Sequence, residues 1–463
     1  MKSAPTLPVR LLLAALLTLA AAPSALRAQP AAQPAAEPPK KEFLPNTTAA
    51  LGQLQKLSEA KNYSAALALI QPLAAGVPPG SYDAYVLNQI QTQLLLAANR
   101  LADAIPTAER ALAISDATPS FGTSENKLEL IHLLGQLHYQ QALEKKLPAD
   151  QAPGLAEALN YAQRWLLEAP RATAEAQLFA ASLLYQLGTL DPARPDSARL
   201  RDTIAQAGEG LLLSGAKIHT QLRLLQVAAH LALGESAPAA ELLELVAEAD
   251  PSSASTWSQL VSLYLARAAE IKDPTESERL HLLALHALDR AQAAGQLTTP
   301  RDHYTRVAVF FNLQQHTRAA ALLEKGLADA TLENTRRNWE LLASAYQQTD
   351  REKLALDALA RAVARFPADA NIEFTLAQSL YQAGQVEAAY ARGQSATAKG
   401  TLEKPGAASL YLAYLAYELQ RYDEAAKWAE LARADGSVPA ATLDPLIRAV
   451  DAARRERAAN LSG

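Results

Sequence analysis

The chain has 463 residues, a formal net charge of −5 and no cysteine. This length exceeds that of a domain with one ordinary core and indicates several domains or a repeat array. The lack of cysteine excludes disulfides, thiolate metal sites and cysteine nucleophiles. The mildly acidic net charge argues against nucleic acid as a partner. Alanine and leucine dominate and only 6% of the residues are aromatic, which favours close-packed helices over sheets.

The first 28 residues have the pattern of a secretory signal peptide. Lys2 and Arg10 precede an apolar run from Leu11 to Ala22, and small residues lead to a candidate cleavage point after Ala28. The run is about 12 residues long, which is too short to span a bilayer. We expect export and cleavage, and retention of the segment as an anchor is the alternative. No later stretch of the sequence is long and apolar enough to cross a membrane.

Residues 29–46 are rich in proline and alanine and lack periodicity, which predicts a disordered tether. From residue 47 to about 215, apolar residues recur with helical spacing and predict degenerate helical hairpins. The third hairpin carries an insertion between its helices, LEKKLPADQAPG at 143–154, and the fourth is broken by LDPARPDSA at 190–198. We expect both segments to form irregular connections.

The clearest hairpin runs from Asn338 to Pro367. Its apolar residues fall on one face of each of two helices, and proline ends the second helix. These residues are Trp339, Leu342, Ala343 and Tyr346 in the first helix and Ala355, Leu359 and Ala362 in the second. Alanine where the helices approach, with large aromatic residues around it, resembles a tetratricopeptide repeat.

Similar hairpins fill residues 216–442, which predicts a C-terminal repeat array. An acidic insert around Lys272–Glu278 is expected to lengthen one turn. A capping helix is expected to start at Asp444-Pro445, within a terminal segment of residues 443–463. The predicted fold class is therefore all-α, a tetratricopeptide-type α-solenoid of about ten helix pairs in a right-handed superhelix with a concave groove. The irregular segments after Gly188 and near Lys272 are candidate boundaries between two halves.

The sequence gives no support to catalysis. It contains no HExxH motif, no glycine-rich phosphate loop and no nucleophile elbow. The eight histidines do not fall in pairs on one helical face, so they are interpreted as solvated or groove-edge residues. We therefore expect no enzyme, no cofactor and no metal; the weaker alternative is an enzyme with a site hidden in the fourth hairpin.

The first helix of each pair is expected to line the concave groove and to bind extended or helical segments of other proteins. Amide, aromatic and charged side chains off the packing face are the candidates, and the alternative is that they are solvated or pack on a neighbouring loop. The candidates are Asn312, Arg337, Glu340, Gln347, Asn371, Phe374, Gln378, Tyr381, Tyr414 and Tyr417.

Residues of about 250–434 resemble a more particular family, the periplasmic tetratricopeptide proteins associated with TonB–ExbB–ExbD energy-transduction systems. The segments that carry this resemblance are AGQL (294–297), AAALLEKGL (319–327), ENT (333–335), AKGTLEKPG (398–406) and LQRYDEAAKWAELA (419–432). The resemblance implies a periplasmic accessory that scaffolds, or couples to, a motor complex for outer-membrane transport, with TonB-, ExbB- or ExbD-type partners and no catalytic residues. The alternative is an envelope-assembly or chaperone-like adaptor for outer-membrane or secreted proteins.

Overall fold

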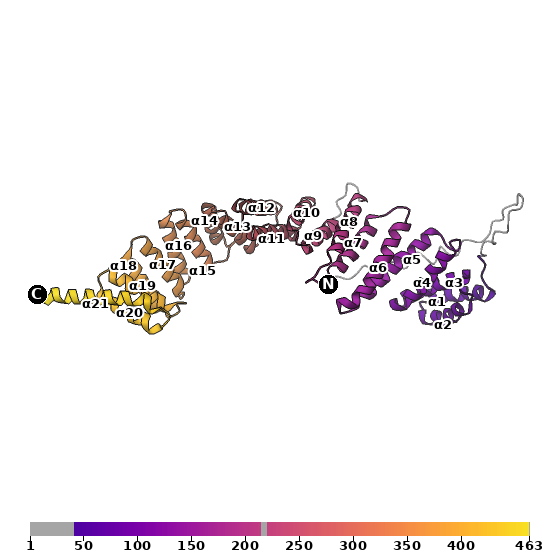
Figure 1. Cartoon of the computed structure of the whole chain (residues 1–463), viewed down its shortest axis with the longest axis horizontal. Helices are drawn as coiled ribbons and strands as arrows, with labels where there is room; N and C mark the ends of the chain where they lie inside the picture. The colour runs from indigo at the N-terminus through magenta and orange to yellow at the C-terminus, as the bar shows by residue number, and fades with distance from the viewer. Residues whose placement is uncertain (1–40, 214–219, 463) are drawn as a thin grey trace. The chain divides into compact units, whose positions relative to one another are not determined.

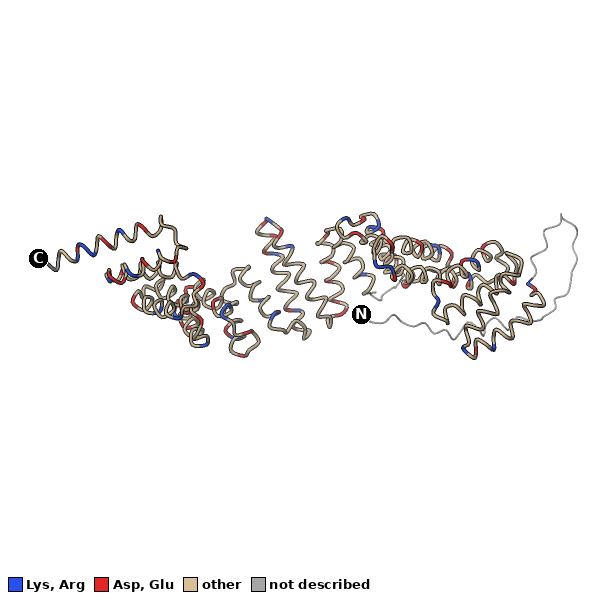
Figure 2. Tube along the Cα trace, turned by 90° about the horizontal axis from the view of Figure 1, so that it is seen from below, with Lys and Arg blue, Asp and Glu red and all other residues tan. Residues whose placement is uncertain are grey.

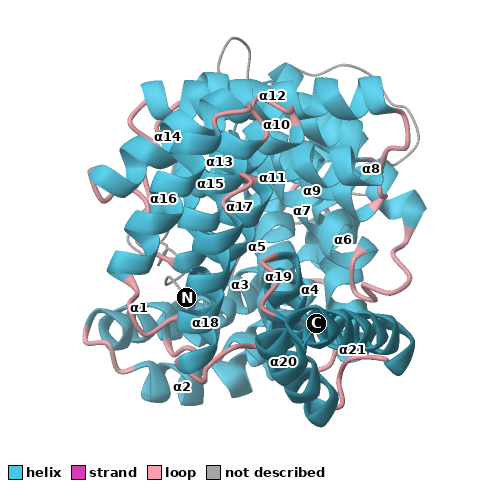
Figure 3. Cartoon of the chain, turned by 90° about the vertical axis from the view of Figure 1, so that its left-hand side faces the viewer, coloured by secondary structure: helices cyan, strands magenta, loops and turns pink. Residues whose placement is uncertain are grey.

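A computed structural model describes residues 41–213 and 220–462. Over these ranges all regular structure is helical: there are 21 helices and no strand (Figure 3). The expected signal peptide and nearly all of the expected tether lie outside the described residues. Within the described part of the chain, no helix is long and apolar enough to span a bilayer.

The chain divides into two compact units, one ending at Ala249 and the other beginning at Asp250. The sequence pattern predicts a change from degenerate to regular repeats between 215 and 216, inside the segment 214–219 that is not described. The regularity of the repeats and the packing of the helices are different criteria, so the boundary at 215 stays a prediction. Figure 1 labels the helices in chain order.

Unit 1 contains five helix pairs. They are α1 (Pro45–Glu59) with α2 (Tyr63–Gly76), α3 (Tyr82–Ala97) with α4 (Leu101–Ala117), α5 (Ser124–Leu143) with α6 (Pro148–Glu168), α7 (Ala174–Gly188) with α8 (Ser197–Leu213), and α9 (Thr220–Ala232) with α10 (Ser236–Ala249).

Unit 2 contains five more pairs and a last helix. They are α11 (Ala254–Glu270) with α12 (Pro274–Ala293), α13 (Pro300–Asn312) with α14 (His316–Ala328), α15 (Arg336–Gln347) with α16 (Glu352–Arg365), α17 (Ala370–Gln382) with α18 (Val386–Ala398), and α19 (Pro405–Glu418) with α20 (Tyr422–Asp435), followed by α21 (Ala440–Ser462).

Within each unit every helix contacts the next one along the chain, which makes each unit a stack of helical hairpins. The expectation of an α-solenoid of about ten helix pairs is confirmed for the described residues, and the right-handed superhelix stays a prediction. Lysine, arginine, aspartate and glutamate are interspersed along both units rather than segregated by sign (Figure 2).

Most turns inside a pair share one backbone conformation. Seven of these turns contain a residue in the left-handed region, at Lys61, Asn99, Gly234, Gln314, Asp350, Gly384 and Gln420. The N–H of the following residue returns to a carbonyl in the last turn of the helix, as Arg351 N does to Tyr346 O at 2.9 Å. This Schellman arrangement satisfies carbonyl groups that the end of the helix would leave unpaired.

Alanine and aromatic residues pack unit 2 as the repeat pattern predicts. Ala343 and Ala355 are buried in one core cluster with Trp339 and Tyr346. Trp339 also lies under the guanidinium of Arg361, whose Cζ is 4.7 Å from the ring centroid. Because both alanines lack a side chain beyond Cβ, the two helices of this pair come close together, and the aromatic rings fill the space beside them.

Two expected insertions are largely helical. In 143–154, α6 already begins at Pro148, and in 272–278, α12 begins at Pro274. Both prolines occupy the first helical position, where the missing N–H has no intrahelical partner to lose. Asp273 caps α12 by accepting from Thr275 N at 3.1 Å. By contrast, the break after Gly188 is confirmed, because α8 does not begin until Ser197.

The expected start of the capping helix was wrong. The helix begins at Ala440, so Pro445 lies inside it rather than at its first turn. Three apolar residues of α21, Leu443, Leu446 and Val450, are buried in a core cluster with residues of α19 and α20. Their spacing extends the packed face across the proline, which explains why the helix begins upstream of it. Beyond Val450 the described side chains are mostly exposed, as expected for a cap.

Candidate protein-binding face

All ten candidate groove residues lie on odd-numbered helices of unit 2 or at their ends, namely on α13, α15, α17 and α19. Three of them join consecutive pairs. Asn312 Nδ2 lies 2.9 Å from His281 Nε2, and Gln347 Nε2 donates to Ser379 Oγ at 3.1 Å. The Arg337 guanidinium lies over the ring of Tyr304, with Cζ 5.4 Å from the centroid. These three side chains therefore contribute to contacts between neighbouring repeats.

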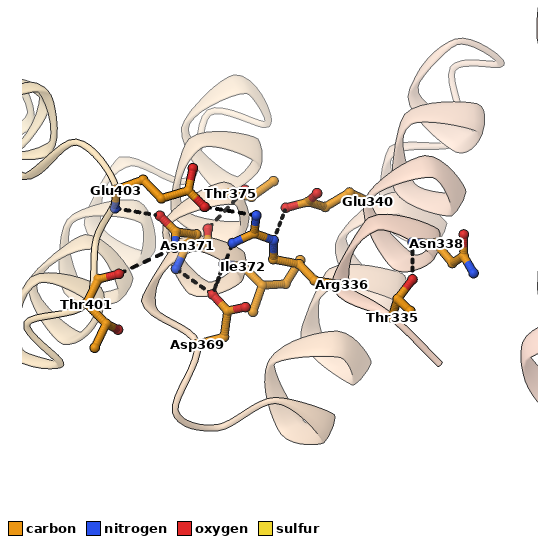
Figure 4. Close-up of polar contacts among 10 residues, drawn as sticks. All are labelled: Thr335, Arg336, Asn338, Glu340, Asp369, Asn371, Ile372, Thr375, Thr401 and Glu403. Carbon is orange, nitrogen blue, oxygen red and sulfur yellow. Dashed lines mark hydrogen bonds and ion pairs between the residues drawn. The ribbon is translucent and has the colours of Figure 1, made fainter. Parts of the chain in front are cut away.

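Of two other candidates, Glu340 pairs with Arg336 and Asn371 lies beside the same group of charges (Figure 4). Arg336 lies 3.0 Å from Glu403, 3.6 Å from Asp369 and 3.7 Å from Glu340. We call Arg336 and these three carboxylates the Arg336 cluster. The cluster draws on α15, on the residue that caps α17, and on the connection between α18 and α19.

Asn371 uses its amide to hold that connection in place. Its Oδ1 accepts from Glu403 N at 3.0 Å, and its Nδ2 donates to Thr401 O at 3.5 Å (Figure 4). The alternative stated from the sequence, packing on a neighbouring loop, therefore describes Asn371.

Negative charge exceeds positive charge in the Arg336 cluster. Burial raises the pKa of the Glu340 carboxyl, and the nearby carboxylates of Asp369 and Glu403 raise it further against the lowering effect of Arg336. A hydrogen bond to Glu403 is the main cause that raises the pKa of Arg336. A single guanidinium is thus paired with three carboxylates, so the surface of α15 and α17 is acidic near the start of α17.

Aromatic candidates on α17 meet a tyrosine of α19 that is not among the predicted residues, Tyr411. Its ring centroid is 5.3 Å from that of Phe374 and 6.0 Å from that of Tyr381, and both pairs are edge-to-face. Tyr411 Oη donates to Ala377 O at 3.4 Å, and burial raises the pKa of Tyr411 to about 12. Tyr411 is therefore a fixed spacer that orients the rings on either side of it.

Two tyrosines beside this spacer are open to solvent. Tyr381 is 40% exposed and Tyr414, three residues after Tyr411 on α19, is 45% exposed. A hydrogen bond from the Tyr381 hydroxyl to Glu418 raises the pKa of Tyr381. We call Phe374, Tyr381, Tyr411 and Tyr414 the aromatic face. Gln378, between the two α17 aromatics, is also exposed.

Tyr417 is separate from the aromatic face. Its ring packs against Tyr422, the first residue of α20, at 5.7 Å between centroids. Tyr411 and Glu418 could have been found from the sequence, because they share one helical side with Tyr414 at spacings of three and four. Arg336 gave no such signal, since its partners Asp369 and Glu403 lie far along the chain.

Histidines and carboxylates do not gather elsewhere in a metal-binding arrangement: within the described residues, no group of three or more could hold an ion. His281 bridges Ser277 O and Asn312, and His138 stacks on Tyr161. These two histidines contact neighbouring side chains and backbone rather than solvent alone.

Comparisons with known proteins give similarity at the level of helical repeats. No family model matches the chain, and no curated protein matches it. TTC0263, a thermophilic TPR protein of Thermus thermophilus, is 22% identical over 45% of this chain and 100% of its own, with a TM-score of 0.25. YrrB, a TPR protein with an unusual peptide-binding site, is 19% identical over 42% and 91%, with a TM-score of 0.31.

PilW, a type IV pilus biogenesis factor, is 15% identical over 50% of this chain and 100% of its own, with a TM-score of 0.32. At these low identities and TM-scores, the assignment of this chain to the α-solenoids rests on its own helix pairs.

Proposed function

We propose that this chain is an exported, non-catalytic scaffold for protein–protein interaction. In this proposal it acts in the periplasm as an accessory of TonB-type outer-membrane transport. The observation that carries the interaction role is the aromatic face, where Tyr381 and Tyr414 are exposed beside the ordered rings of Phe374 and Tyr411. Tyrosine is enriched where proteins meet, because its ring is apolar and its hydroxyl is polar.

The transport role is supported by the sequence resemblance of residues 250–434 to the TonB-associated repeat proteins. A partner of this kind would be a component of the motor complex, bound through an extended or helical segment. The adaptor alternative differs in its clients, which would be many unrelated outer-membrane or secreted chains.

The test is affinity capture from an envelope extract of the organism that makes the protein, using the chain without residues 1–28 as bait. A second bait carries Tyr381→Ala and Tyr414→Ala, and a control bait carries Leu431→Ala, which truncates a side chain 53% exposed on α20. Bound proteins are identified by mass spectrometry.

We expect TonB-, ExbB- or ExbD-type components on the unmodified and control baits and their loss from the tyrosine variant. A broad spread of outer-membrane proteins would overturn the transport role in favour of the adaptor. Equal capture of motor components by the tyrosine variant would place binding away from the aromatic face.

A further inference from the structure

Three rings of the aromatic face, those of Tyr411, Tyr381 and Phe374, have contacts within the chain that order them before any partner arrives. Tyr411 Oη donates to Ala377 O, and the Tyr381 hydroxyl is hydrogen-bonded to Glu418 while its ring packs edge-to-face on Tyr411. Phe374 is wedged edge-to-face against Tyr411. A ligand that stacks on these rings would pay little for ordering them, which makes the surface suited to a short segment with few contacts.

The spacing of the rings suits one extended conformation in particular. Phe374 and Tyr381 are seven residues apart on α17, a rise of about 10 Å. A polyproline II helix repeats every three residues, a rise of about 9 Å. Residues i and i+3 of such a segment can therefore lie against the two α17 aromatics in turn, as proline does in aromatic-lined grooves.

Carboxylates lie at both ends of the aromatic face. The Arg336 cluster contributes three near the start of α17, and Glu418 is hydrogen-bonded to Tyr381 near its end. Nearby cations are fewer: Arg336 is already shared among three carboxylates, Arg337 lies over Tyr304 on the side of α13, and Lys404 is exposed beside Glu403. The surface therefore offers acidic groups and tyrosine faces together, a combination that attracts lysine and arginine.

We propose that the aromatic face binds a polyproline II segment of a partner protein that carries lysine or arginine among its prolines. Prolines stack on Phe374, Tyr381 and Tyr414, and the cations reach the Arg336 cluster and Glu418. From Asp369 to Tyr381 the surface extends about 18 Å, which about six extended residues cross. The inference rests on the proposed function, because it names the class of segment that the scaffold binds.

The first experiment measures peptide binding to the chain without residues 1–28 by fluorescence anisotropy. The probe is a labelled peptide of four Lys-Pro-Pro repeats. Two matched probes replace every lysine with glutamate, or every Pro-Pro with Gly-Ser. We expect the Lys-Pro-Pro probe to bind, the glutamate probe to bind at least about tenfold more weakly, and added salt to weaken the lysine probe.

Binding of the glutamate probe as tightly as the lysine probe would overturn the charge assignment. Equal binding of the Gly-Ser probe would overturn the polyproline assignment. An unlabelled peptide of residues 29–42, which contains PPKK at 38–41, serves as a competitor. If this peptide displaces the probe and binds as tightly as the probe does, the segment that occupies the aromatic face is the chain's own N-terminal segment and not a partner protein.

Variants locate the site. The double substitution Tyr381→Ala with Tyr414→Ala should lower the affinity for the lysine probe about tenfold, because two stacking surfaces are lost. The double substitution Glu340→Gln with Glu418→Gln should lower the affinity for the lysine probe several-fold and make that affinity less dependent on salt. The matched controls are Leu431→Ala and Glu430→Gln on α20, which should leave binding within twofold, and circular dichroism checks that each variant is folded. An unchanged affinity in the folded tyrosine variant would overturn the proposed site.

The outcomes separate this inference from the function on which it rests. If envelope capture depends on the two tyrosines but no lysine–proline probe binds, the scaffold stands and the segment class is wrong. If the probe binds at the aromatic face but no motor component is captured, the segment class stands and the transport role is wrong.

Discussion

Single side chains in unit 2 show how a repeat stack carries polar groups inside it. Tyr390 is fully buried, and its hydroxyl donates to Glu424 Oε2 at 2.6 Å and accepts from Trp428 Nε1 at 2.9 Å. Burial, followed by the hydrogen bond to Glu424, raises the pKa of Tyr390 to about 12. The hydroxyl thus connects α18 to α20 and stays neutral over the physiological range.

Removing that hydroxyl should destabilise unit 2. Tyr390→Phe keeps the ring but leaves the Glu424 carboxylate and the Trp428 N–H without their partner, at a cost of about 1–3 kcal/mol. The loss of stability is measured by urea unfolding as a lower midpoint. Hydrogen exchange of the amides of α18 and α20 shows that the loss lies in these helices. Tyr414→Phe, at an exposed position, is the control and should change stability by less than about 0.5 kcal/mol. Equal effects of the two substitutions would contradict the role of the buried bond.

Glu373 makes the stability of unit 2 depend on pH. Burial acts to raise the pKa of this carboxyl, but hydrogen bonds from Lys399 and Ser395 and the charge of Lys399 outweigh burial, and the pKa is lowered. A lowered folded-state pKa means that the stabilisation is present above the unfolded pKa of about 4.3 and is lost as pH falls through the folded value.

Unit 2 should therefore lose stability as the pH is lowered below about 4.3, and Glu373→Gln should remove part of this dependence. At neutral pH the same substitution should cost about 1–3 kcal/mol, because Lys399 loses the carboxylate that lies 2.5 Å from its Nζ. Urea unfolding at a series of pH values measures both effects. An identical pH profile for the variant would assign the acid sensitivity to other carboxylates.

Elements in this protein begin and end by a small set of local rules. Turns inside the pairs depend on left-handed residues, and several helices begin with proline at the first position. The sequence was sufficient to predict the helix pairs, because Trp339, Ala343 and Tyr346 repeat with helical period. It was insufficient for three helix starts, because Pro148, Pro274 and Pro445 are compatible with a break, a first turn or a helix interior.

The candidate site was predicted in part for a related reason. Phe374 and Tyr381 on α17 and Tyr414 on α19 could be predicted, because their spacing places each of them off the packing face of its own helix. Tyr411 could be placed on the same helical side as Tyr414, but its contacts and those of Arg336 could not be predicted, because they depend on the register between helices one or two repeats apart. That register is set by the packing of whole helices and not by any local motif.

The left-handed turn residue is open to a direct test at Gly384, which has a φ of +72° and where an added Cβ would meet no heavy atom within 4 Å. Gly384→Ala should therefore destabilise unit 2 by about 1 kcal/mol through backbone strain alone. Gln420→Gly, at φ +58°, should stabilise unit 2 slightly or leave its stability unchanged. Urea midpoints for the two variants provide the measurement, and a stabilising alanine at 384 would refute the role of the turn.

Close approach of the two helices in a pair is tested at Ala355, which is buried between α15 and α16. Ala355→Trp should destabilise unit 2 by about 3 kcal/mol or more, because the indole cannot be placed without separating the helices. Leu354→Trp, at the exposed neighbouring position, is the control. Thermal unfolding that is unchanged by Ala355→Trp would contradict the packing.

The whole molecule is expected to reach the periplasm without its first 28 residues. Cells that express the full chain should yield a periplasmic product whose N-terminus is Gln29, identified by intact-mass measurement and N-terminal peptide sequencing. A product that keeps Met1 in the membrane fraction would favour the retained anchor. A product that keeps Met1 in the cytoplasm would contradict export.

The Arg336 cluster has a consequence for how unit 2 comes apart. Arg336 belongs to α15, whereas Glu403 precedes α19, so this ion pair reaches past the intervening pair of α17 and α18. In a simple stack each repeat senses only its nearest neighbours, and the terminal pair frays by itself. This link past a repeat adds a small coupling between pairs that are not neighbours, about 1 kcal/mol or less for an ion pair exposed at both ends, so opening of the last pair carries the added cost of breaking a contact with α15.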